Sequence, residues 1–449
     1  MNIKVDSRKI VPGNTFVALR GNKDGHTYVL DAIKNGAARV IVEEGLYDVE
    51  TLIVKDTRKY LEDYLYENYY NYIKDLKIIG VTGTNGKTTT CYLLHECLNN
   101  FGIKTAYIGT IGFYINDKIR ELNNTTPDIL DLYELLIECK EKECKYVVME
   151  VSSHALSLGR VETIKFDYAL FTNLTKDHLD FHKTMDEYKK TKIKLFKKLK
   201  DKGKAIINAD SQYKNDFLLP GVNNITYGFM SSDYQIIDYN VSKNNSKFLV
   251  KNKSTIMAVT TNLIGKHNLY NILSTIAILS DIGIEKEKIS KIFESISAPP
   301  GRMDKINYKD NTIIIDYAHT PDAVINVLIA VKKLNPNKII TVVGCGGDRD
   351  KTKRSEMAIA ATNLSNHVVF TSDNPRTEDA KQIIDDMINN LNNNNYEIEI
   401  NRKKAIIKGI QMLKKNDILM VLGKGHENYQ IIGTTKYHFD DKEVVLENI

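Results

Sequence analysis

The sequence predicts an α/β protein of three domains, and three observations favour this class. Its 449 residues are enough for three domains of about 100–200 residues each. An apolar run leads into Gly83-Thr84-Asn85-Gly86-Lys87-Thr88, as in the parallel sheet of a P-loop ATPase domain. Beyond residue 300, strand-like and helix-like runs alternate, which predicts a Rossmann-like, doubly wound sheet. We expect a small N-terminal α/β domain at residues 1–75, a central P-loop domain at 76–299 and a C-terminal domain at 300–449.

Composition excludes several classes of protein. The apolar content of 42% and charged content of 27% are those of globular domains. The net charge is only +5, without a basic tail or patch, so no nucleic-acid partner is expected. No apolar run approaches the length of about 18 residues that spans a membrane, and the first residues do not form a signal peptide. The five cysteines contain no C-x-x-C pair, which suits a cytoplasmic protein without a zinc site. We expect a monomer.

The N-terminal segment predicts a small α/β unit. A strand at 15–19 precedes a helix from Tyr28 to Asn35, and Gly36 ends that helix at the position that favours glycine. A second strand follows at 39–42. Taken alone, Asp6-Ser7-Arg8 indicates only a polar turn.

The central segment opens with a strand, the loop Gly83–Thr88 and a helix from Thr88 to Asn100. Such a loop points backbone N–H groups at a phosphate, with the helix dipole behind them. Lys87 would reach the β- and γ-phosphates, and the Thr88 hydroxyl would bind Mg²⁺. Val81 replaces the first glycine of the strict pattern, so this is a variant P-loop. The alternative is a glycine-rich turn before an ordinary helix.

Two strand ends beyond the P-loop carry candidate ligands. A helix from Ile129 to Lys142 leads into the buried strand 145–151, whose end carries Glu150. Ligands bind at the carboxyl ends of parallel strands, so Glu150 is placed to hold Mg²⁺, although a salt bridge is the plainer alternative. His178 and His182 follow the strand 167–172. As a transition-metal site they are a weak signal, and either is more often a structural hydrogen-bonding residue.

One face of the next helix contains an unexpected lysine. Met185, Tyr188, Lys192, Leu195 and Leu199 are spaced 3, 4, 3 and 4 residues apart, which places them on one inward face. A bare ammonium there is costly unless it is paired. Lys192 either extends to the surface or is chemically neutralised or inverted in charge, and the pattern alone favours the surface.

The run from 223 to 260 predicts a β-rich excursion, and a long apolar helix then extends to Leu279. Asn268 and Asn271 lie one turn apart at its start. Their amides would bind a purine edge or simply cap the helix.

The third segment starts at the hinge 299–302 and alternates cleanly. Strands are predicted at 312–316, 338–343, 367–371 and 418–422, with helices that end at Leu334, Leu364 and Leu391. Polar, glycine-rich loops follow the strands, and we expect a substrate site spread over them. These loops are 316–321, 344–350, 373–376 and 423–427.

A P-loop domain hinged to a domain with polar loops fits a ligase that closes over ATP. A carboxylate would attack the γ-phosphate, and an amine would displace phosphate from the acyl phosphate. Lys87, Mg²⁺ and Arg302 would stabilise the transferring phosphoryl group. A P-loop switch is the alternative from another class, and it leaves the C-terminal loops unexplained.

Over nearly its whole length the chain resembles the Mur ligase family. The similar motifs are 83–88, Glu150-Val151-Ser152-Ser153-His154, 173–180, 265–268, 300–302 and 316–321. Asp6-Ser7-Arg8, Thr125-Thr126-Pro127, Asp373-Asn374-Pro375-Arg376 and 423–427 resemble the member that adds the third residue of the peptidoglycan stem peptide.

The resemblance implies a role for each matching residue. Ser7 and the turn 24–26 would lie near uridine, and Thr125, Thr126, Ser153, Arg160 and Lys192 would bind UDP-MurNAc-L-Ala-D-Glu. Thr88, Glu150 and His178 would ligate Mg²⁺. ATP would contact Gly83, Thr84, Asn85, Gly86, Lys87, Thr88, Thr89, Asn268, Asn271, Arg302, Asp316 and His319. Lys87, Lys192, His178 and Arg302 would be catalytic. In this family the lysine that matches Lys192 is carbamylated to N6-carboxylysine, which reverses the preference for a surface lysine.

The resemblance also bears on the incoming amino acid. In relatives that use meso-diaminopimelate, the Asn-Pro-Arg arginine binds a carboxylate that lysine lacks. Arg376 is present, so we expect meso-diaminopimelate, with Arg349, Asp373, Asn374, Pro375, Arg376, Gly423 and Glu427 at the site. Ala380 departs from the proline of many relatives, which we expect to affect only a helix start. The implied function is cytoplasmic peptidoglycan precursor synthesis, in support of cell-wall growth, cell shape and division. An L-lysine-adding ligase and a folylpolyglutamate-type ligase are the alternatives.

Overall fold

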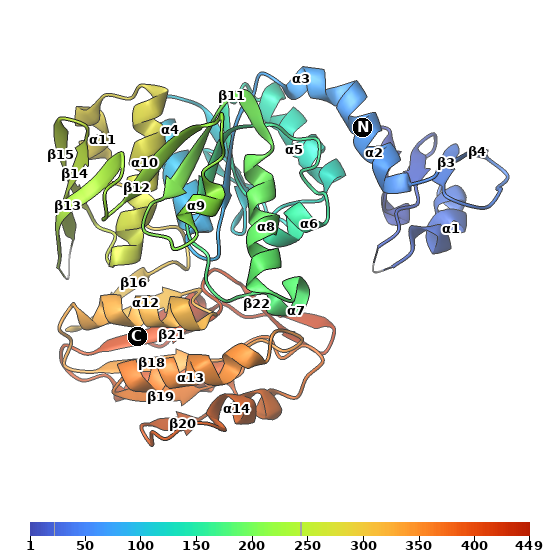
Figure 1. The fold of residues 1–449 in the computed structure, drawn as a ribbon. Helices are drawn as coiled ribbons and strands as arrows, with labels where there is room; N and C mark the ends of the chain where they lie inside the picture. Colours follow the sequence, from blue (N-terminus) through green and yellow to red (C-terminus); the bar gives the residue numbers. More distant parts are fainter. Residues whose placement is uncertain (22, 243–244) are drawn as a thin grey trace.

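The computed structural model describes residues 1–21, 23–242 and 245–449, and it confirms the α/β fold class. The described chain forms three parallel or mixed sheets, each with its own helices, and a two-stranded antiparallel sheet near the C-terminus (Figure 1). The N-terminal sheet stands to one side of the central one, and the C-terminal sheet lies below it (Figure 1). The expected boundaries at 75/76 and 299/300 fall between these sheets and stay predictions.

The N-terminal sheet is small and wholly parallel. Its core includes Phe16, Val29 and Val40, which pack the sheet against a short helix. The 3-10 helix and Gly36, with φ of 101°, limit the helix to six residues, so it is shorter than predicted. The elements are β1 (Ile3–Lys4), η1 (Ser7–Lys9), β2 (Thr15–Val17), η2 (Gly25–Tyr28), α1 (Val29–Lys34), β3 (Arg39–Val42) and β4 (Glu50–Ile53).

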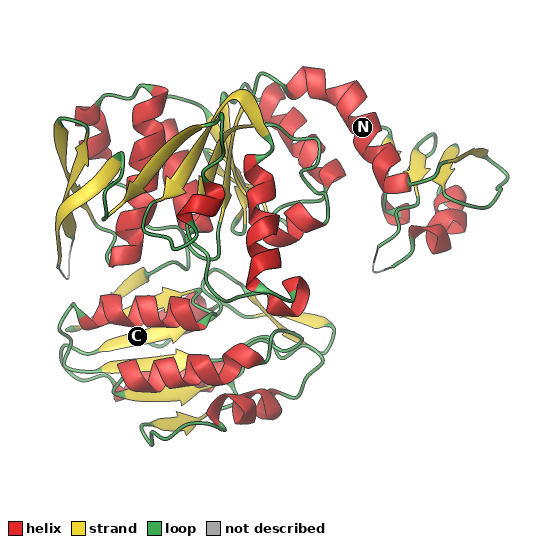
Figure 2. Ribbon diagram, viewed as in Figure 1, coloured by secondary structure: helices red, strands yellow, loops and turns green. Residues whose placement is uncertain are grey.

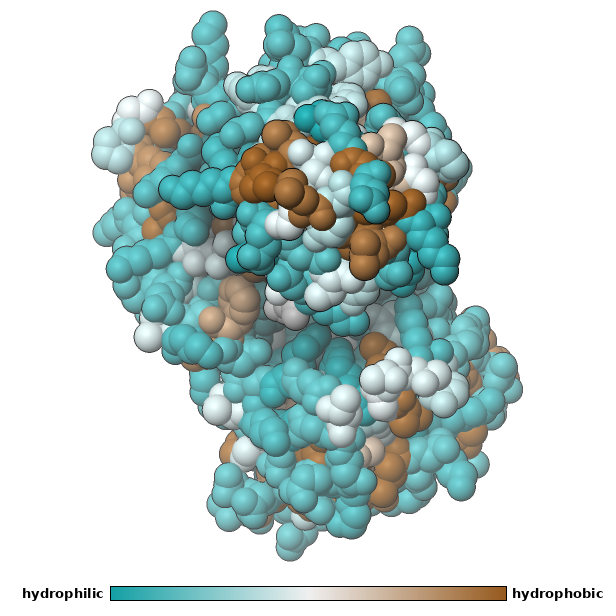
Figure 3. Space-filling view, turned by 90° about the vertical axis from the view of Figure 1, so that its right-hand side faces the viewer, coloured by the Kyte–Doolittle hydropathy of each residue, from teal (hydrophilic) through white to brown (hydrophobic). Residues whose placement is uncertain are grey.

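A helical linker joins this sheet to the central domain. It consists of α2 (Thr57–Leu65), the π-helix η3 (Tyr66–Tyr70) and α3 (Asn71–Ile73). Arg58 pairs with Asp128 at 2.9 Å, and Lys4 pairs with Glu134 at 2.9 Å. Asp128 caps the central-domain helix α5 (Ile129–Glu141) and Glu134 lies within it, so the linker and the N-terminal sheet are tied to that helix. Figure 3 views the molecule from this side; the face is mostly hydrophilic, and apolar side chains gather in its upper half.

The central sheet has eleven strands, with the strand before the P-loop near its middle. Along this strand Ile78 packs with one core, whereas Ile79 and Val81 pack with the other, as the alternation of a strand buried on both faces requires. The strands are β5 (Lys77–Thr82), β6 (Thr105–Gly109), β7 (Gly112–Ile115), β8 (Asp117–Arg120), β9 (Tyr146–Glu150), β10 (Phe166–Phe171), β11 (Leu199–Asn208), β12 (Asn223–Gly228), β13 (Tyr234–Val241), β14 (Ser246–Asn252) and β15 (Thr255–Thr261).

Helices cover both faces of this sheet (Figure 2). Helices α4 and α10 pack together on the face of Ile79, and α5 and α8 pack on the face of Ile78. The helices are α4 (Lys87–Asn100), α5 (Ile129–Glu141), α6 (Ser153–Ser157), α7 (Leu179–His182), α8 (Met185–Phe196), α9 (Lys214–Phe217), α10 (Lys266–Ile282) and α11 (Lys286–Ile292).

Two sequence predictions in this domain are adjusted. The β-rich run is confirmed as β12–β15, although residues 243 and 244 within it lie outside the described residues. The helix predicted through Leu199 ends at Phe196, and Leu199 begins β11. The reason is strand pairing: Phe166 N donates to Lys198 O at 3.0 Å and Phe166 pairs with Leu199, which draws the chain into the sheet.

The C-terminal sheet confirms the four predicted strands and orders them as β16-β17-β21-β18-β19-β20. The last predicted strand, β21, lies in the middle, between β17 and β18. Helices α12, α13 and α14 cover one face, and α15 and α16 the other. The elements are β16 (Asp304–Tyr308), β17 (Asn311–Asp316), α12 (Pro321–Lys332), β18 (Ile339–Val343), α13 (Thr352–Leu364), β19 (His367–Phe370), α14 (Ala380–Ile388), β20 (Tyr396–Ile398), α15 (Arg402–Met412), β21 (Ile418–Leu422), β22 (Tyr429–Ile432), β23 (Thr435–His438) and α16 (Asp441–Leu446).

Among the described residues, no helix combines the length and the apolar character needed to cross a membrane. All five cysteines are free and buried.

A wholly buried ion pair gives the first prediction. Arg402 donates to both carboxylate oxygens of Asp441 at 2.7 Å, and both side chains are 0% exposed. Arg402→Ala leaves Asp441 as an uncompensated buried charge, so the free energy of unfolding should fall by about 3–5 kcal/mol in urea titrations. Lys403→Ala, which removes an exposed pair with Glu447, should change it by less than about 1 kcal/mol. Equal effects of the two variants would contradict this account.

Candidate active site

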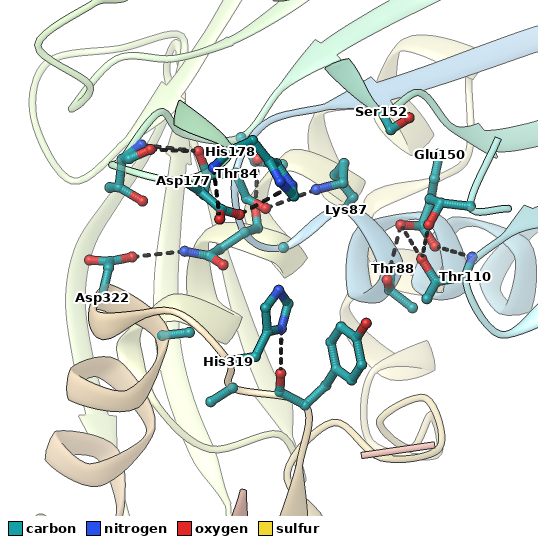
Figure 4. Close-up of a pocket in the computed structure, with 18 of the residues that line it drawn as sticks. Thr84, Lys87, Thr88, Thr110, Glu150, Ser152, Asp177, His178, His319 and Asp322 are labelled. Carbon is teal, nitrogen blue, oxygen red and sulfur yellow. Dashed lines mark hydrogen bonds and ion pairs between the residues drawn. The ribbon is translucent and has the colours of Figure 1, made fainter. Parts of the chain in front are cut away.

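A cavity of 1310 Å³ lies between the central and C-terminal sheets, at the carboxyl ends of their strands. It is lined on one side by the P-loop and the ends of β9 and β10, and on the other by loops after β17, β18, β19 and β21. Figure 4 shows part of this lining. Loops at the carboxyl edges of two parallel sheets thus converge on one space, as the sequence predicted.

Two glycines of the P-loop are required by close packing. Gly83 and Gly86 have φ angles of 150° and 87°. A Cβ on Gly83 would overlap the hydroxyl of Thr172, and one on Gly86 would lie 2.5 Å from Asn271 Oδ1. Helix α4 begins at Lys87, so its free N–H groups face the cavity. The loop therefore has the geometry of an anion site at a helix N-terminus.

Lys87 folds back on this loop. Its Nζ donates to the carbonyls of Gly83 and Thr84 at 2.9 and 2.8 Å. Burial lowers the pKa of Lys87, and the positive charge of Arg302 acts in the same direction. The ammonium is therefore desolvated and held where a phosphate would lie.

Glu150 is fixed by four hydrogen bonds. Its Oε1 accepts from Tyr107 Oη at 2.6 Å and Thr110 N at 2.8 Å, and its Oε2 accepts from the hydroxyls of Thr88 and Thr110 at 3.0 and 3.1 Å. Arg302 Nη2 donates to the same Thr88 hydroxyl at 3.1 Å. Sequence reasoning missed Tyr107 and Thr110, although Thr110 directly follows a strand end.

Two of the three predicted Mg²⁺ ligands fit the ion in kind, whereas the third, His178, offers a ring nitrogen. Carboxylate and hydroxyl oxygens, here Glu150 and Thr88, are the donors that Mg²⁺ prefers. In Figure 4 the Lys87 side chain points toward His178, and the Thr88–Glu150 pair lies apart from them. Within the described chain, no three His, Cys, Asp or Glu side chains form a ready metal cage.

His178 has an unusual backbone and a neutral ring. Its φ is 54°, and its Nε2 lies 3.3 Å from Asp177 Oδ2. Burial lowers the pKa of His178 to about 3, with His154 and Lys87 adding to the shift against the pull of Asp177. His182 packs on Tyr188, with ring centroids 4.9 Å apart, so the two histidines do not act as a metal-binding pair.

Lys192 is buried beneath the P-loop. It is 1% exposed, so the surface position that the pattern alone favoured, and that the resemblance reversed, is wrong. Its Nζ donates to Gly83 O at 2.9 Å and lies 4.4 Å from the centroid of the Tyr188 ring. Burial holds the pKa of Lys192 well below its ordinary value, and the positive charge of Lys87 adds to this. The proton of Lys192 is therefore held less tightly than that of an exposed lysine.

Asn268 and Asn271 support the P-loop. Asn271 Nδ2 donates to Asn268 Oδ1 at 3.2 Å, and Asn268 Nδ2 donates to Ile264 O at 2.9 Å. The Thr90 hydroxyl donates to Asn271 Oδ1 at 3.3 Å. Both asparagines line the cavity, but the chain of amides connects α10 to α4. Neither of the two side chains caps α10 by a bond to one of its N–H groups.

Three predicted residues reach the cavity from the segment before β16 (Arg302), the end of β17 (Asp316) and the loop that follows β17 (His319). The Arg302 guanidinium lies 4.2 Å from the centroid of the Tyr317 ring. Asp316 accepts from Met303 N at 2.7 Å and from Ala318 N, so it shapes this loop. Burial raises the pKa of Asp316 and lowers that of His319 to about 4.

The C-terminal loops form a polar pocket of mixed charge. Asn374 Nδ2 donates to Glu427 Oε2 at 2.8 Å, and Arg376 Nη1 donates to Gly347 O at 2.7 Å. Burial lowers the pKa of Arg349, and the nearby charge of Arg376 lowers it further, so two guanidinium groups share one space. A Cβ on Gly423 would overlap the carboxylate of Asp373, which explains its φ of 112°.

Some predicted residues lie outside the cavity lining. Thr125 and Arg160 line it, whereas Thr126 and Ser153 are buried behind it. Thr126 Oγ1 donates to Glu150 O at 2.8 Å, and Arg160 Nη1 donates to Thr126 O at 3.0 Å. The cavity lining also excludes Gly83, Lys192 and Pro375, and Ser7 lies in the N-terminal domain.

Contacts between the two domains were not predicted. Asn85 Nδ2 donates to Asp322 Oδ2 at 2.8 Å, and Lys176 pairs with Glu356 at 2.7 Å. Each joins a central residue to a C-terminal helix. The sequence does not show which polar residues on a helix surface pair with another domain.

Comparison with known proteins identifies related chains. The Mur ligase middle domain model matches residues 81–279, and the Mur ligase glutamate ligase domain model matches 301–425. A protein of Fusobacterium nucleatum subsp. nucleatum, named UDP-N-acetylmuramoyl-L-alanyl-D-glutamate–2,6-diaminopimelate ligase, is 46% identical over 100% of this chain and 93% of its own.

Two solved structures extend this comparison. One, titled as the structure of a ligase with the same name, has a TM-score of 0.69 at 33% identity and covers 100% of this chain and 94% of its own. The other, titled MurF ligase from Thermotoga maritima in complex with ADP, has a TM-score of 0.71 at 20% identity over 94% of this chain and 93% of its own. The latter similarity concerns the fold alone.

Proposed function

Because the chain belongs to the Mur ligase family, we propose that it is an ATP-dependent ligase that adds meso-diaminopimelate to UDP-MurNAc-L-Ala-D-Glu. The observation that supports this most strongly is the single cavity that joins the P-loop to the pocket of Arg349, Asn374, Arg376 and Glu427. A nucleotide-dependent switch needs only the first of these two features. The names of the relatives agree with the proposal.

The reaction proceeds in two steps, formation of an acyl phosphate and its displacement by the amine. The glutamate carboxylate of the dipeptide attacks the γ-phosphorus of ATP, and the bond to the bridging oxygen breaks to release ADP. The substrate amine then attacks the acyl carbon, loses a proton and expels inorganic phosphate. Lys87 and Arg302 stabilise charge on the transferring phosphoryl group, since both lie beside the N-terminus of α4.

Thr88, Glu150 and His178 would hold Mg²⁺, which neutralises phosphate charge when bound. His178 is suited to this role because its pKa of about 3 keeps the ring neutral at physiological pH. The four bonds to Glu150 keep its carboxylate facing the P-loop. ATP would also contact the remaining P-loop residues, Asn268, Asn271, Asp316 and His319.

Lys192 is proposed to react with carbon dioxide to form N6-carboxylysine. The neutral amine attacks the carbon, one proton is lost, and the product is a carbamate anion. The remaining N–H of the carbamate retains a donor for Gly83 O. An anion there would offset the positive charge of Lys87, which the free amine cannot do.

The two substrates that are joined are assigned to residues of different domains. Arg376 would bind the distal carboxylate of meso-diaminopimelate, with Arg349, Asp373, Asn374, Pro375, Gly423 and Glu427 around it. Thr125, Thr126, Ser153 and Arg160 would bind the dipeptide, and Ser7 and the turn 24–26 would lie near uridine. The proposed setting is cytoplasmic peptidoglycan precursor synthesis by a monomer.

The direct test supplies ATP, Mg²⁺ and UDP-MurNAc-L-Ala-D-Glu with either meso-diaminopimelate or L-lysine, and measures phosphate release. Release should require all components, and kcat/KM should be at least about tenfold higher with meso-diaminopimelate. Equal use of lysine would refute the specificity. Turnover of ATP without the other substrates would favour the switch.

Arg376→Lys tests the carboxylate contact. Lysine loses the planar, two-pronged donor, so kcat/KM for meso-diaminopimelate should fall at least about tenfold, while KM for ATP stays unchanged. The control is Arg120→Lys, the same change at an exposed position on β8, which should leave both constants unchanged. A parallel rise in KM for ATP would argue against a specific role.

Lys192→Ala tests the carbamate. Activity should fall at least about a hundredfold and be partly restored by short carboxylic acids that supply the missing anion. Incubation of the wild type with ¹³C-bicarbonate should give a carbamate NMR signal that this variant lacks. Lys198→Ala removes a nearby lysine that pairs with Glu162, and its activity should not respond to carboxylic acids. An identical response in both variants would exclude the carbamate.

A further inference from the structure

A fully buried lysine, Lys424, lies behind the amino-acid pocket. It follows β21 between Gly423 and Gly425, whose φ angles of 112° and 54° allow the tight turn. Its side chain is 0% exposed. Taking an ammonium out of water costs several kcal/mol unless its partners compensate, so its contacts indicate what it does.

The contacts of Lys424 converge on two residues of the pocket. Its Nζ donates to Asn374 Oδ1 at 3.2 Å and to Glu427 Oε2 at 3.3 Å. Asn374 Nδ2 donates to the same Oε2 at 2.8 Å, so the three side chains form a closed triangle. Glu427 N also donates to Lys424 O at 2.9 Å, which fixes the backbone between them.

The surroundings of Glu427 disfavour the ionised form of its carboxyl group. Burial raises the pKa of Glu427, and repulsion from Asp373 raises it further. Lys424 is the cation that opposes this in direct contact, with help from the Asn374 amide. The titratable and charged groups that interact with the carboxylate are Tyr317, Asp373, Arg402, Lys424 and Tyr429.

The proposed substrate makes this charge important. The distal end of meso-diaminopimelate is a zwitterion, with a carboxylate for Arg376 and an ammonium that needs an anion. Glu427 lines the cavity and is the adjacent carboxylate. A protonated Glu427 would offer the substrate ammonium no countercharge. A Glu427 side chain that could rotate freely would not stay directed at that ammonium.

We propose that Lys424 is a positioning residue for recognition of the distal ammonium, because it holds Glu427 ionised and, together with Asn374, oriented toward the cavity. This inference rests on the proposed function. Lys424 acts through Glu427 and makes no contact with the substrate itself.

The test measures kcat/KM for meso-diaminopimelate against pH in Lys424→Met, with ATP and UDP-MurNAc-L-Ala-D-Glu saturating. Without the cation, Glu427 keeps its proton to higher pH, so the acidic limb should move upward by about one pH unit or more. At pH values on the acidic limb kcat/KM should fall about tenfold for each unit of this shift, while KM for ATP stays unchanged. Lys424→Gln, which retains a donor but not the charge, should give the same shift.

The matched control is Lys436→Met. Lys436 is exposed on β23, and its Nζ lies 3.6 Å from the centroid of the Tyr429 ring, whereas that of Lys424 lies 5.4 Å from it. The control therefore removes the same charge next to the same ring, but outside the pocket. Its acidic limb should coincide with that of the wild type.

The possible results distinguish a failure of the proposed Lys424 role from a failure of the proposed ligase function. A uniform loss of activity in both Lys424 variants with an unmoved acidic limb would overturn the positioning role, because a merely structural lysine gives that result. If thermal melting shows that Lys424→Met does not fold, the position of the acidic limb in Lys424→Gln decides instead. A wild type that does not use meso-diaminopimelate would overturn the proposed function and this inference together.

Discussion

Two lysines, the half-buried Lys87 and the buried Lys192, donate to one carbonyl oxygen, that of Gly83, and the arrangement of the central site depends on this contact. Lys87 approaches it from α4 and Lys192 from α8, each at 2.9 Å. Positive charge on both nitrogens is unfavourable so close together in a low-dielectric interior, and burial and the charge of Lys87 lower the pKa of Lys192 accordingly. The site therefore favours loss of one positive charge, or addition of negative charge, and both phosphates and a carbamate provide the latter.

The rest of the P-loop serves to hold that carbonyl in place. Tyr188 lies under Lys192 and its hydroxyl lies 3.3 Å from Thr84 Oγ1, so the ring links α8 to the loop. Asn271 packs against Gly86 from α10 on the other side. The loop is thus supported by helices from both faces of the sheet, which prearranges its N–H groups before a ligand arrives.

The strong periodic patterns were predictable, and the local contacts were not. The alternation of strands and helices after residue 300 predicted the C-terminal strands, because each strand is buried on both faces. The order of strands was not predictable: nothing in Ile418–Leu422 indicates that it lies between β17 and β18. Lys192 was misplaced from pattern alone because a lysine on an apolar stripe usually reaches water. Tyr107 gave no signal because a buried tyrosine in a strand is ordinary until its hydroxyl is seen on Glu150.

The bonds that cross from the P-loop to the C-terminal domain have a thermodynamic consequence. Asn85 is bonded to Asp322, and the Thr88 hydroxyl accepts from Arg302. A ligand that displaces Asp322 from Asn85, or Arg302 from Thr88, loses the free energy of the bond that it breaks. Ligand affinity at the P-loop and the approach of the two domains are therefore reciprocally coupled. Breaking the bond between Asn85 and Asp322 therefore adds to the free energy needed to draw the P-loop away from the C-terminal domain.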